Sequence, residues 1–143
     1  METGRPFLGI CVGMQLLFDY SLEFGRHEGL GLIPGHVAPI SATDENGQRK
    51  VPHIGWSRVC RPEGGKAWDD TVLAECKSGE NSFYFVHSYN CEPVDPSMVL
   101  AEADYLGSRI CAAVQRDNIT AFQCHPEKSS SAGLSVFRRF LKQ

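Results

Sequence analysis

The chain has 143 residues, of which 42% are hydrophobic and 22% charged, with a formal net charge of −3. This length and balance are those of one soluble globular domain with a real hydrophobic core. The 14 Lys and Arg are scattered, which argues against a nucleic-acid partner, and the apolar runs are far shorter than the ~20 residues of a membrane-spanning helix.

The chain opens on a predicted strand, residues 7–10, that runs through a sharp turn at Cys11 into a predicted helix. That helix is inferred from apolar residues at helical spacing: Met14, Leu16, Leu17 and Phe18. Strands that end in such a turn normally lie inside a parallel sheet, with other strands on both sides. We therefore expect N-terminal strands of the sheet to be missing from this chain.

The middle of the chain is predicted to contain loops and short strands. Residues 25–35 include four glycines and favour a loop. Two extended segments, 36–40 and 50–54, flank turn-forming residues and predict a β-hairpin or a wider β-connection. Residues 69–75 are predicted to form a short helix.

Strands dominate from Ser82 onward, over residues 83–86, 99–101, 110–114 and 119–122, with a tight turn at Asp117-Asn118. An amphipathic helix over 130–141 closes the chain, with Leu134, Phe137, Phe140 and Leu141 on one face. These elements predict an α/β fold with a mostly parallel sheet that carries Cys11 at a strand end.

Six cysteines are many for this length, and they bear on cell compartment and metal binding. No two form a C-x-x-C pair, and the segment ahead of Phe7 has no apolar signal-peptide region. We therefore expect a cytoplasmic protein with reduced, mostly buried thiols and no disulfide framework. Cys124 beside His125 leaves a zinc site open as an alternative, although no second pair has ligand spacing. The main expectation is no metal and no cofactor.

The pentapeptide GICVG, residues 9–13, places Cys11 in the G-x-nucleophile-x-G pattern of a nucleophile elbow. Its glycines permit a strained turn and close approach of neighbouring backbone, and the following helix directs its positive end at the sulfur. We expect this setting and a nearby imidazolium to lower the pKa of the thiol and to form a thiolate at neutral pH. A Gly-rich turn with a buried Cys is the alternative for the pentapeptide alone.

His125, Pro126 and Glu127 form the second chemical motif. Residues two apart in an extended segment project to the same side, so Glu127 can orient the imidazole of His125. Pro126 stiffens the segment. With Cys11, these side chains would act as nucleophile, base and orienter. A His and a Glu flanking a Pro are by themselves more often surface residues, and the elbow is what favours a catalytic role.

The segments PFLGICVGMQ, residues 6–15, and QCHPEKS, residues 123–129, resemble the nucleophile and His/Glu motifs of class I glutamine amidotransferases. Three further segments, GLGLIPG at 29–35, VPHIGW at 51–56 and YFVHSY at 84–89, resemble the branch of that family that serves histidine biosynthesis. The resemblance runs from Pro6 to the C-terminal helix. It implies one flavodoxin-like amidotransferase domain over 1–143, which is the C-terminal two-thirds of the family's domain.

The resemblance also implies the chemistry of a glutaminase. Cys11 would attack the carboxamide of L-glutamine, His125 would protonate the departing ammonia and then activate water, and Glu127 would hold His125. A γ-glutamyl thioester forms and is hydrolysed. The Val12 amide would be one oxyanion donor. The amino-acid end of glutamine would be held by Gly13, Gln15, His87, Ser88 and Tyr89.

In this branch the ammonia passes to a TIM-barrel cyclase subunit, so the resemblance implies a heterodimer. The interface would include Pro52, His53, Ile54, Gly55, Trp56, Tyr84 and Lys128. Trp56 is the strongest of these predictions, because aromatic anchors dominate such contacts. Without the resemblance, the same residues would be interpreted as a turn, a core aromatic and a solvated Lys.

Some residues depart from the family pattern, and other functions stay open. Ile54 stands where Met is usual, Ser57 where Asn is common and Val12 where Leu is common. Cys124 replaces a Phe beside the predicted base, which predicts a small cavity or an oxidisable thiol there. The alternatives are another amidotransferase of the same class, of the CTP or GMP synthesis type, or an inactive truncated module that binds the cyclase without turnover.

Overall fold

The computed structural model describes residues 4–48 and 50–143. Residues 1–3 belong to the N-terminal segment that the sequence predicts to lack a signal peptide, and they lie outside the described part. Its strands and helices are, in chain order, β1 Phe7–Ile10, α1 Val12–Gln15, β2 Phe18–Ser21, β3 His27–Glu28, β4 Ile33–Pro39, β5 His53–Arg58, β6 Ser82–His87, β7 Tyr89–Pro93, β8 Val99–Tyr105, β9 Ser108–Arg116, β10 Ile119–Phe122 and α2 Ser130–Phe140. Two short 3-10 turns, η1 Pro96–Met98 and η2 Pro126–Lys128, complete the set.

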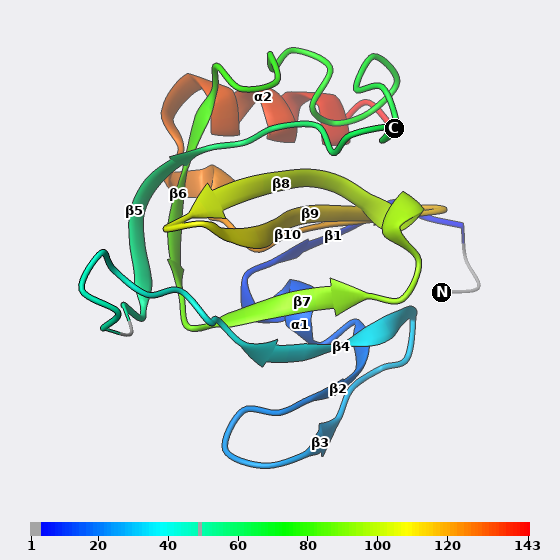
Figure 1. Ribbon diagram of the computed structural model, residues 1–143. Coiled ribbons are helices and arrows are strands. Elements are labelled where there is room, and N and C mark those ends of the chain that lie inside the picture. The colour runs from blue at the N-terminus through cyan, green and yellow to red at the C-terminus, as the bar shows by residue number, and fades with distance from the viewer. Residues whose placement is uncertain (1–3, 49) are drawn as a thin grey trace.

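The strands form three sheets (Figure 1), in the orders β1-β10-β9-β8, β3-β2-β4-β7 and β5-β6. Only two of the seven described pairings, β1 with β10 and β2 with β4, are parallel. The α/β class is confirmed, but the prediction of a mostly parallel sheet is wrong. The reason is the short turns at 106–107 and 117–118, since strands joined by such turns can only lie antiparallel.

Tertiary contacts override local pattern at several predicted elements. The helix after Cys11 ends at Gln15, and Phe18 begins strand β2, because the backbone amides of Leu30 and Ile33 bind the carbonyls of Leu16 and Leu17. The predicted β-hairpin is also wrong: β4 pairs with β2 and β7, whereas β5 pairs with β6. Residues 69–75 form turns instead of a helix.

The closing helix and the late strands follow the sequence pattern more closely. The four late strands are present as parts of β6, β8, β9 and β10, and Asp117 turns the chain with a φ of 51°. Helix α2 is present, and its buried face matches the predicted one only in part: Phe137 and Phe140 are half-buried, and Phe140 packs against the core. Val136 is fully buried, whereas Leu134 and Leu141 are 58% and 82% exposed. Gly133 accounts for the rotation, because a Cβ there would overlap the carbonyl oxygen of Pro126.

The central sheet β1-β10-β9-β8 separates two hydrophobic clusters. One lies on the side of α2 and contains Phe83, Phe85 and Phe122, and the other lies on the side of α1, β2 and β4 and contains Met14 and Phe18. Figure 1 shows α2 above this sheet and β2, β4 and β7 below it, with β5 and β6 running along one side. Both faces of β10 are therefore buried, which explains its continuous apolar sequence.

Candidate active site

The central sheet brings Cys11 and His125 to the same edge. Strand β1 is parallel to β10, with Ile10 opposite Phe122, and the Cys11 N–H donates to the Phe122 carbonyl at 2.7 Å. Cys11 follows β1 directly, and His125 comes three residues after β10. Because adjacent parallel strands end at one edge of a sheet, two motifs more than a hundred residues apart in sequence become neighbours.

Cys11 sits on the sharp, strained turn that its pattern predicts. Its φ of 54° and ψ of −115° lie in a region that non-glycine residues rarely adopt. The Cys11 carbonyl accepts the Met14 and Gln15 N–H groups at 2.9 and 3.2 Å, which starts α1. A Cβ at Gly9 would lie 2.9 Å from the Gly13 carbonyl oxygen. The glycine before the nucleophile is thus required by the close approach of the turn to itself.

The Cys11 thiol has a raised pKa, so the predicted thiolate at neutral pH is not what this structure favours. Burial of the half-buried side chain raises it most, the Val12 N–H lowers it, the Glu127 carboxylate raises it and Lys128 lowers it. Helix α1 has only four residues, and the His125 Nε2 makes no hydrogen bond. The raised pKa therefore favours the thiol form of Cys11 in the resting site.

The raised pKa of Cys11 predicts how its thiol reacts with a simple alkylating agent. Only the thiolate reacts, so the rate should rise about tenfold per pH unit and should not level off below pH 9.0, the ordinary pKa value that burial raises. Iodoacetamide kinetics followed by peptide mass spectrometry measure this, with the Cys11→Ala chain as the blank. A plateau below neutral pH would show instead that Cys11 rests as a thiolate.

His125 is held by both its backbone and its ring. Its N–H donates to the Tyr84 carbonyl at 2.8 Å, and its own carbonyl accepts the Ser129 hydroxyl at 2.6 Å. The ring Nδ1–H donates to Glu127 Oε1 at 2.6 Å. A carboxylate can only accept, so Nδ1 carries the proton, and in the neutral ring Nε2 offers its lone pair.

The Nε2 atom of His125 is buried and has no hydrogen-bond partner. A buried polar atom without a partner costs free energy, and native structures keep few of them without a functional reason. Together with the carboxylate on the other ring nitrogen, it matches the base of a nucleophile, base and orienter arrangement. This nitrogen is therefore the strongest sign of proton transfer in the described part of the chain.

Gln123 joins the site although the sequence motifs did not mark it as a functional residue. It is fully buried, its Oε1 accepts from Gln15 Nε2 at 3.0 Å, and its Nε2 lies 3.9 Å from the Cys11 sulfur. The signal was present in the sequence: an uncharged amide directly after the apolar run of β10. Gln123 links the predicted glutamine-binding residue Gln15 to the predicted nucleophile.

The predicted glutamine-binding residues fall into two groups. Val12, Gly13 and Gln15 lie in α1 beside Cys11, and a Cβ at Gly13 would meet nothing within 4 Å, so this side is open. His87 ends β6, Ser88 connects the two strands and Tyr89 begins β7. The His87 ring is only 6% exposed and bonded to other protein groups, so its backbone alone remains available to a ligand.

Three of the seven predicted interface residues, Ile54, Trp56 and Tyr84, lie on the outer face of the β5–β6 ribbon. Ile54 and Trp56 are 58% and 54% exposed, and Trp56 lies opposite Tyr84, with ring centroids 6.0 Å apart. The Lys128 ammonium is 6.0 Å from the Tyr84 ring centroid. Pro52 is exposed and Gly55 half-buried.

His53 does not belong to that outer face. It is 1% exposed, because side chains alternate along a strand and its position points inward. The structure therefore does not support a direct contact between the His53 side chain and a partner.

Four of the remaining cysteines are buried, and Cys60 is partly exposed. All six thiols are free, and Cys124 is fully buried, which raises its pKa far above the usual range and disfavours the reactive thiolate. Burial of Cys124 therefore argues against the oxidisable thiol, one of the two alternatives predicted beside His125. In residues 4–48 and 50–143 no group of three His, Cys, Asp or Glu side chains is arranged to hold a metal ion. No helix in the same ranges is both long and apolar enough to cross a membrane.

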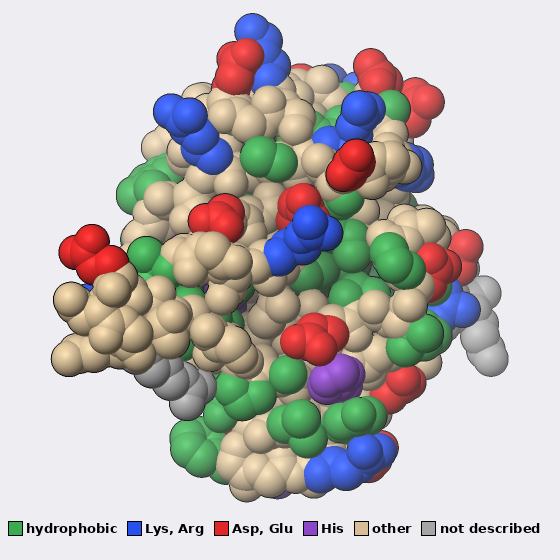
Figure 2. Space-filling model, in the orientation of Figure 1, with side chains coloured by type: hydrophobic (Ala, Val, Ile, Leu, Met, Phe, Trp, Pro, Cys, Tyr) green, Lys and Arg blue, Asp and Glu red, His purple; other side chains and the backbone are tan. Residues whose placement is uncertain are grey.

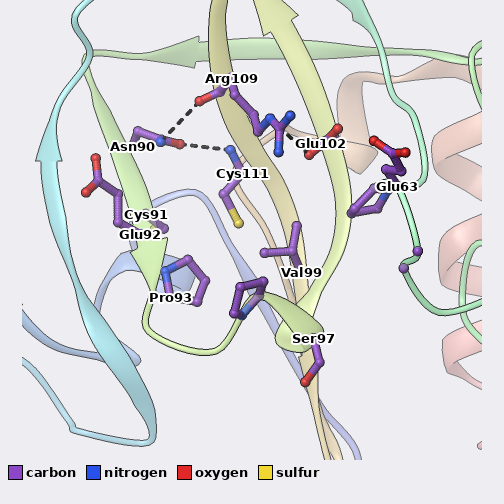
Figure 3. Close-up of a pocket in the computed structure, with 14 residues that line it drawn as sticks. Glu63, Asn90, Cys91, Glu92, Pro93, Ser97, Val99, Glu102, Arg109 and Cys111 are labelled. Carbon is purple, nitrogen blue, oxygen red and sulfur yellow. Dashed lines mark hydrogen bonds and ion pairs between the residues drawn. The ribbon is translucent and has the colours of Figure 1, made fainter.

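A separate cavity of about 610 Å³ lies between β7, β8, β9 and the loop at 62–65. Figure 3 shows Arg109 beside Glu102, 3.5 Å apart, while Asn90 accepts the Cys111 N–H at 2.9 Å. Cys11 and His125 are not among its lining residues. On the face drawn in Figure 2, basic and acidic side chains are interspersed without a continuous basic stripe. Neither feature competes with the Cys11 site.

Comparison with known proteins places this geometry in a known group. The family model of glutamine amidotransferase class-I matches residues 1–143. The chain is 43% identical over 142 residues to imidazole glycerol phosphate synthase subunit HisH 1 of Legionella pneumophila (strain Lens), covering 99% of this chain and 66% of that protein. It is 49% identical over 144 residues to subunit HisH of Syntrophotalea carbinolica, covering 98% of this chain and 66% of that protein. The chain thus spans just under two thirds of the length of these relatives.

Solved structures show the same fold at low sequence identity. A putative GMP synthase component of Thermoplasma acidophilum aligns with a TM-score of 0.63 at 20% identity, over 99% of this chain and 58% of that one. A glutamine amidotransferase of Thermotoga maritima aligns with a TM-score of 0.59 at 16% identity, over 99% and 47%.

Proposed function

Because the chain belongs to the class I glutamine amidotransferase family, we propose that it hydrolyses L-glutamine to glutamate and ammonia through a thioester on Cys11. The observation that carries this proposal is the His125 ring, with Nδ1 held by Glu127 at 2.6 Å and Nε2 buried without a partner. The single domain over 1–143 supplies nucleophile, base and orienter from two adjacent strand ends.

The reaction follows from the resting protonation states. Nε2 of His125 takes the Cys11 proton as the sulfur attacks the carboxamide carbon of glutamine, and the Val12 N–H faces the developing oxyanion. The imidazolium then protonates the nitrogen, the C–N bond breaks and ammonia leaves. Water next gives a proton to Nε2 as its oxygen attacks the thioester carbon. The C–S bond then breaks, the imidazolium returns this proton to the sulfur, and glutamate leaves with the thiol restored. Glu127 stabilises the imidazolium in both steps.

The glutamine end is recognised from both sides of Cys11. Gly13 and Gln15 lie next to the nucleophile on α1, and the proposed contacts from the other side come from the backbone at 87–89, where β6 ends and β7 begins. Gln123 supports this arrangement, since it holds the Gln15 amide at 3.0 Å. We assign Gln123 a positioning role between these groups.

The proposed acceptor of the ammonia is the TIM-barrel cyclase subunit of imidazole glycerol phosphate synthase, in a cytoplasmic heterodimer of histidine biosynthesis. Support comes from relatives at 43–49% identity that are named subunit HisH of that synthase. The exposed Trp56, which packs against the half-buried Tyr84, supports the same partner, because protein–protein contacts concentrate on such anchors.

Glutamine turnover tests the proposed activity. With the cyclase subunit of a relative present, the chain should release glutamate and ammonia in equal amounts, and the Cys11→Ala chain should release neither. The Cys124→Ala chain is the matched control, because that thiol is buried two residues before the η2 turn and takes no part in the reaction. Ammonia release that persists in the Cys11→Ala chain would contradict the proposal. Stimulation by a CTP or GMP synthesis partner instead of the cyclase would reassign the acceptor.

A further inference from the structure

Two buried histidines join the inner face of β5 to the loop that follows β6. His53 and His87 lie directly opposite each other in the β5–β6 register, and His53 Nδ1 is 3.0 Å from His87 Nε2. His53 Nε2 lies 2.9 Å from the Ser57 hydroxyl, and His87 Nδ1 lies 2.8 Å from the Tyr89 carbonyl oxygen. Ser57, His53, His87 and the Tyr89 carbonyl thus form a continuous string of three hydrogen bonds, the histidine string.

The last acceptor sets the direction of every proton in the histidine string. A carbonyl oxygen can only accept, so His87 Nδ1 must carry a hydrogen. The neutral His87 ring then accepts at Nε2, which requires a hydrogen on His53 Nδ1. His53 Nε2 in turn accepts the Ser57 hydroxyl hydrogen. Both rings are therefore Nδ1–H tautomers, and a proton added to His87 would leave two donors facing each other.

The surroundings of both rings favour their neutral forms. His53 is stacked between Phe85 of β6 and Tyr105 of β8, with ring centroids 4.7 and 4.0 Å away. Burial, and then His87, lower the pKa of His53 to about 4. Burial also lowers the pKa of His87, the Tyr89 carbonyl opposes this, and His125 lowers it further. His125 is thus the titratable group outside the string that acts on it.

The two ends of the histidine string lie at functionally different places. Ser57 is the direct neighbour of Trp56, which is 54% exposed on the outer face of β5. The Tyr89 carbonyl belongs to the backbone at 87–89, which the proposed function places at the amino-acid end of glutamine. A shift of β5 by the length of one hydrogen bond would either move that backbone or leave a buried polar atom without a partner.

We propose that His53 and His87 are positioning residues, whose histidine string fixes the 87–89 backbone for glutamine and ties it to the β5 strand that carries Trp56. This role rests on the proposed function. It differs from that of ordinary core histidines, which would stabilise the fold without affecting glutamine binding. It also assigns a function to His53, whose burial rules out a direct side-chain contact with a partner.

Matched substitutions of His87 separate positioning from packing. An Asn amide nitrogen reaches the place of Nδ1, whereas a Gln amide reaches the place of Nε2. His87→Asn keeps the donor to Tyr89 and loses the acceptor for His53, whereas His87→Gln loses the donor to Tyr89. We therefore expect a KM for glutamine about tenfold higher in His87→Gln than in His87→Asn, with little difference in kcat. The midpoints of urea unfolding show whether the two variants are equally stable. Equal KM values for two equally stable variants would overturn the positioning role.

The same logic applies to His53. His53→Asn keeps the donor toward His87, and His53→Gln keeps only the group that faces Ser57. We expect a higher KM for His53→Gln than for His53→Asn. The reverse order would overturn the proposed direction of the hydrogen bonds.

A second measurement needs no glutamine and separates the two proposals. In nitrogen-15 NMR spectra of the unaltered chain at neutral pH, His53 and His87 should both appear as neutral Nδ1–H tautomers, assigned from the single variants. Either ring as a cation or as an Nε2–H tautomer overturns the histidine string even if turnover is normal. Expected tautomers in a chain that does not hydrolyse glutamine with the cyclase present would overturn the proposed function, and the positioning role with it.

Discussion

Replacing Glu127 by Gln is expected to lower the rate of glutamine hydrolysis by about 10³- to 10⁴-fold, the scale seen when the orienting acid of a catalytic triad becomes an amide. The Glu127 carboxylate accepts the Nδ1–H of His125 at 2.6 Å and so leaves Nε2 as the base. A Gln amide N–H at this place favours the opposite tautomer, with the hydrogen on Nε2. That ring can no longer take the Cys11 proton.

The control for this substitution is Glu75→Gln. The Glu75 side chain is 43% exposed, the same value as Glu127, and it pairs with Arg138 at 3.1 Å on the surface. Losing such a surface pair changes stability by at most about 1 kcal/mol and should leave turnover unchanged. Steady-state ammonia release measures both variants. A loss of activity below about tenfold for Glu127→Gln would mean that His125 acts as the base without needing Glu127.

Removing the Trp56 side chain is expected to weaken binding of the cyclase subunit by about 30-fold or more, because truncating an aromatic anchor costs on the order of 2 kcal/mol. The ring is 54% exposed and packs edge-on against Tyr84, so its loss should leave the fold of the chain intact. Titration calorimetry of the Trp56→Ala chain with the cyclase subunit gives the dissociation constant.

Phe24→Ala provides the matched comparison for Trp56→Ala. Phe24 is 93% exposed and lies between β2 and β3, in a different sheet from the β5–β6 ribbon. Its removal takes away a similar aromatic surface and should not affect the dissociation constant. A larger loss for Phe24→Ala than for Trp56→Ala would place the partner on a different part of the molecule from the one proposed.

Local sequence patterns predicted what depends on neighbouring residues. The apolar run at 119–122 reads as a buried strand because both of its faces meet hydrophobic clusters, and the turn at Asp117 follows from ordinary turn chemistry. The elbow at Cys11 could likewise be predicted, since the glycine at 9 is required by an approach within the same few residues. His125 and Glu127 are two apart, so their contact is local as well.

Features set by distant contacts could not be predicted in the same way. The short α1 helix is followed by Leu16 and Leu17, whose carbonyls accept N–H groups of residues 30–33. The sequence of residues 12–18 gives no sign of these contacts. The burial of His53 depends on its strand lying over Phe85 and Tyr105. The pKa of Cys11 rises because folding desolvates the sulfur, which opposes the lowering expected from the elbow alone. In each case a tertiary contact decided between two locally reasonable outcomes.

The most direct test of the central claim is the intact mass of the chain after incubation with an electrophilic glutamine analogue, with the cyclase subunit present. Cys11 and Cys60 are the two partly exposed thiols, so Cys60 is an internal control for unselective reaction. We predict one adduct per chain, located on Cys11, slowed by added glutamine and absent from the Cys11→Ala chain. Equal labelling of Cys60 and Cys11, or labelling that glutamine does not slow, would contradict a glutamine site at Cys11.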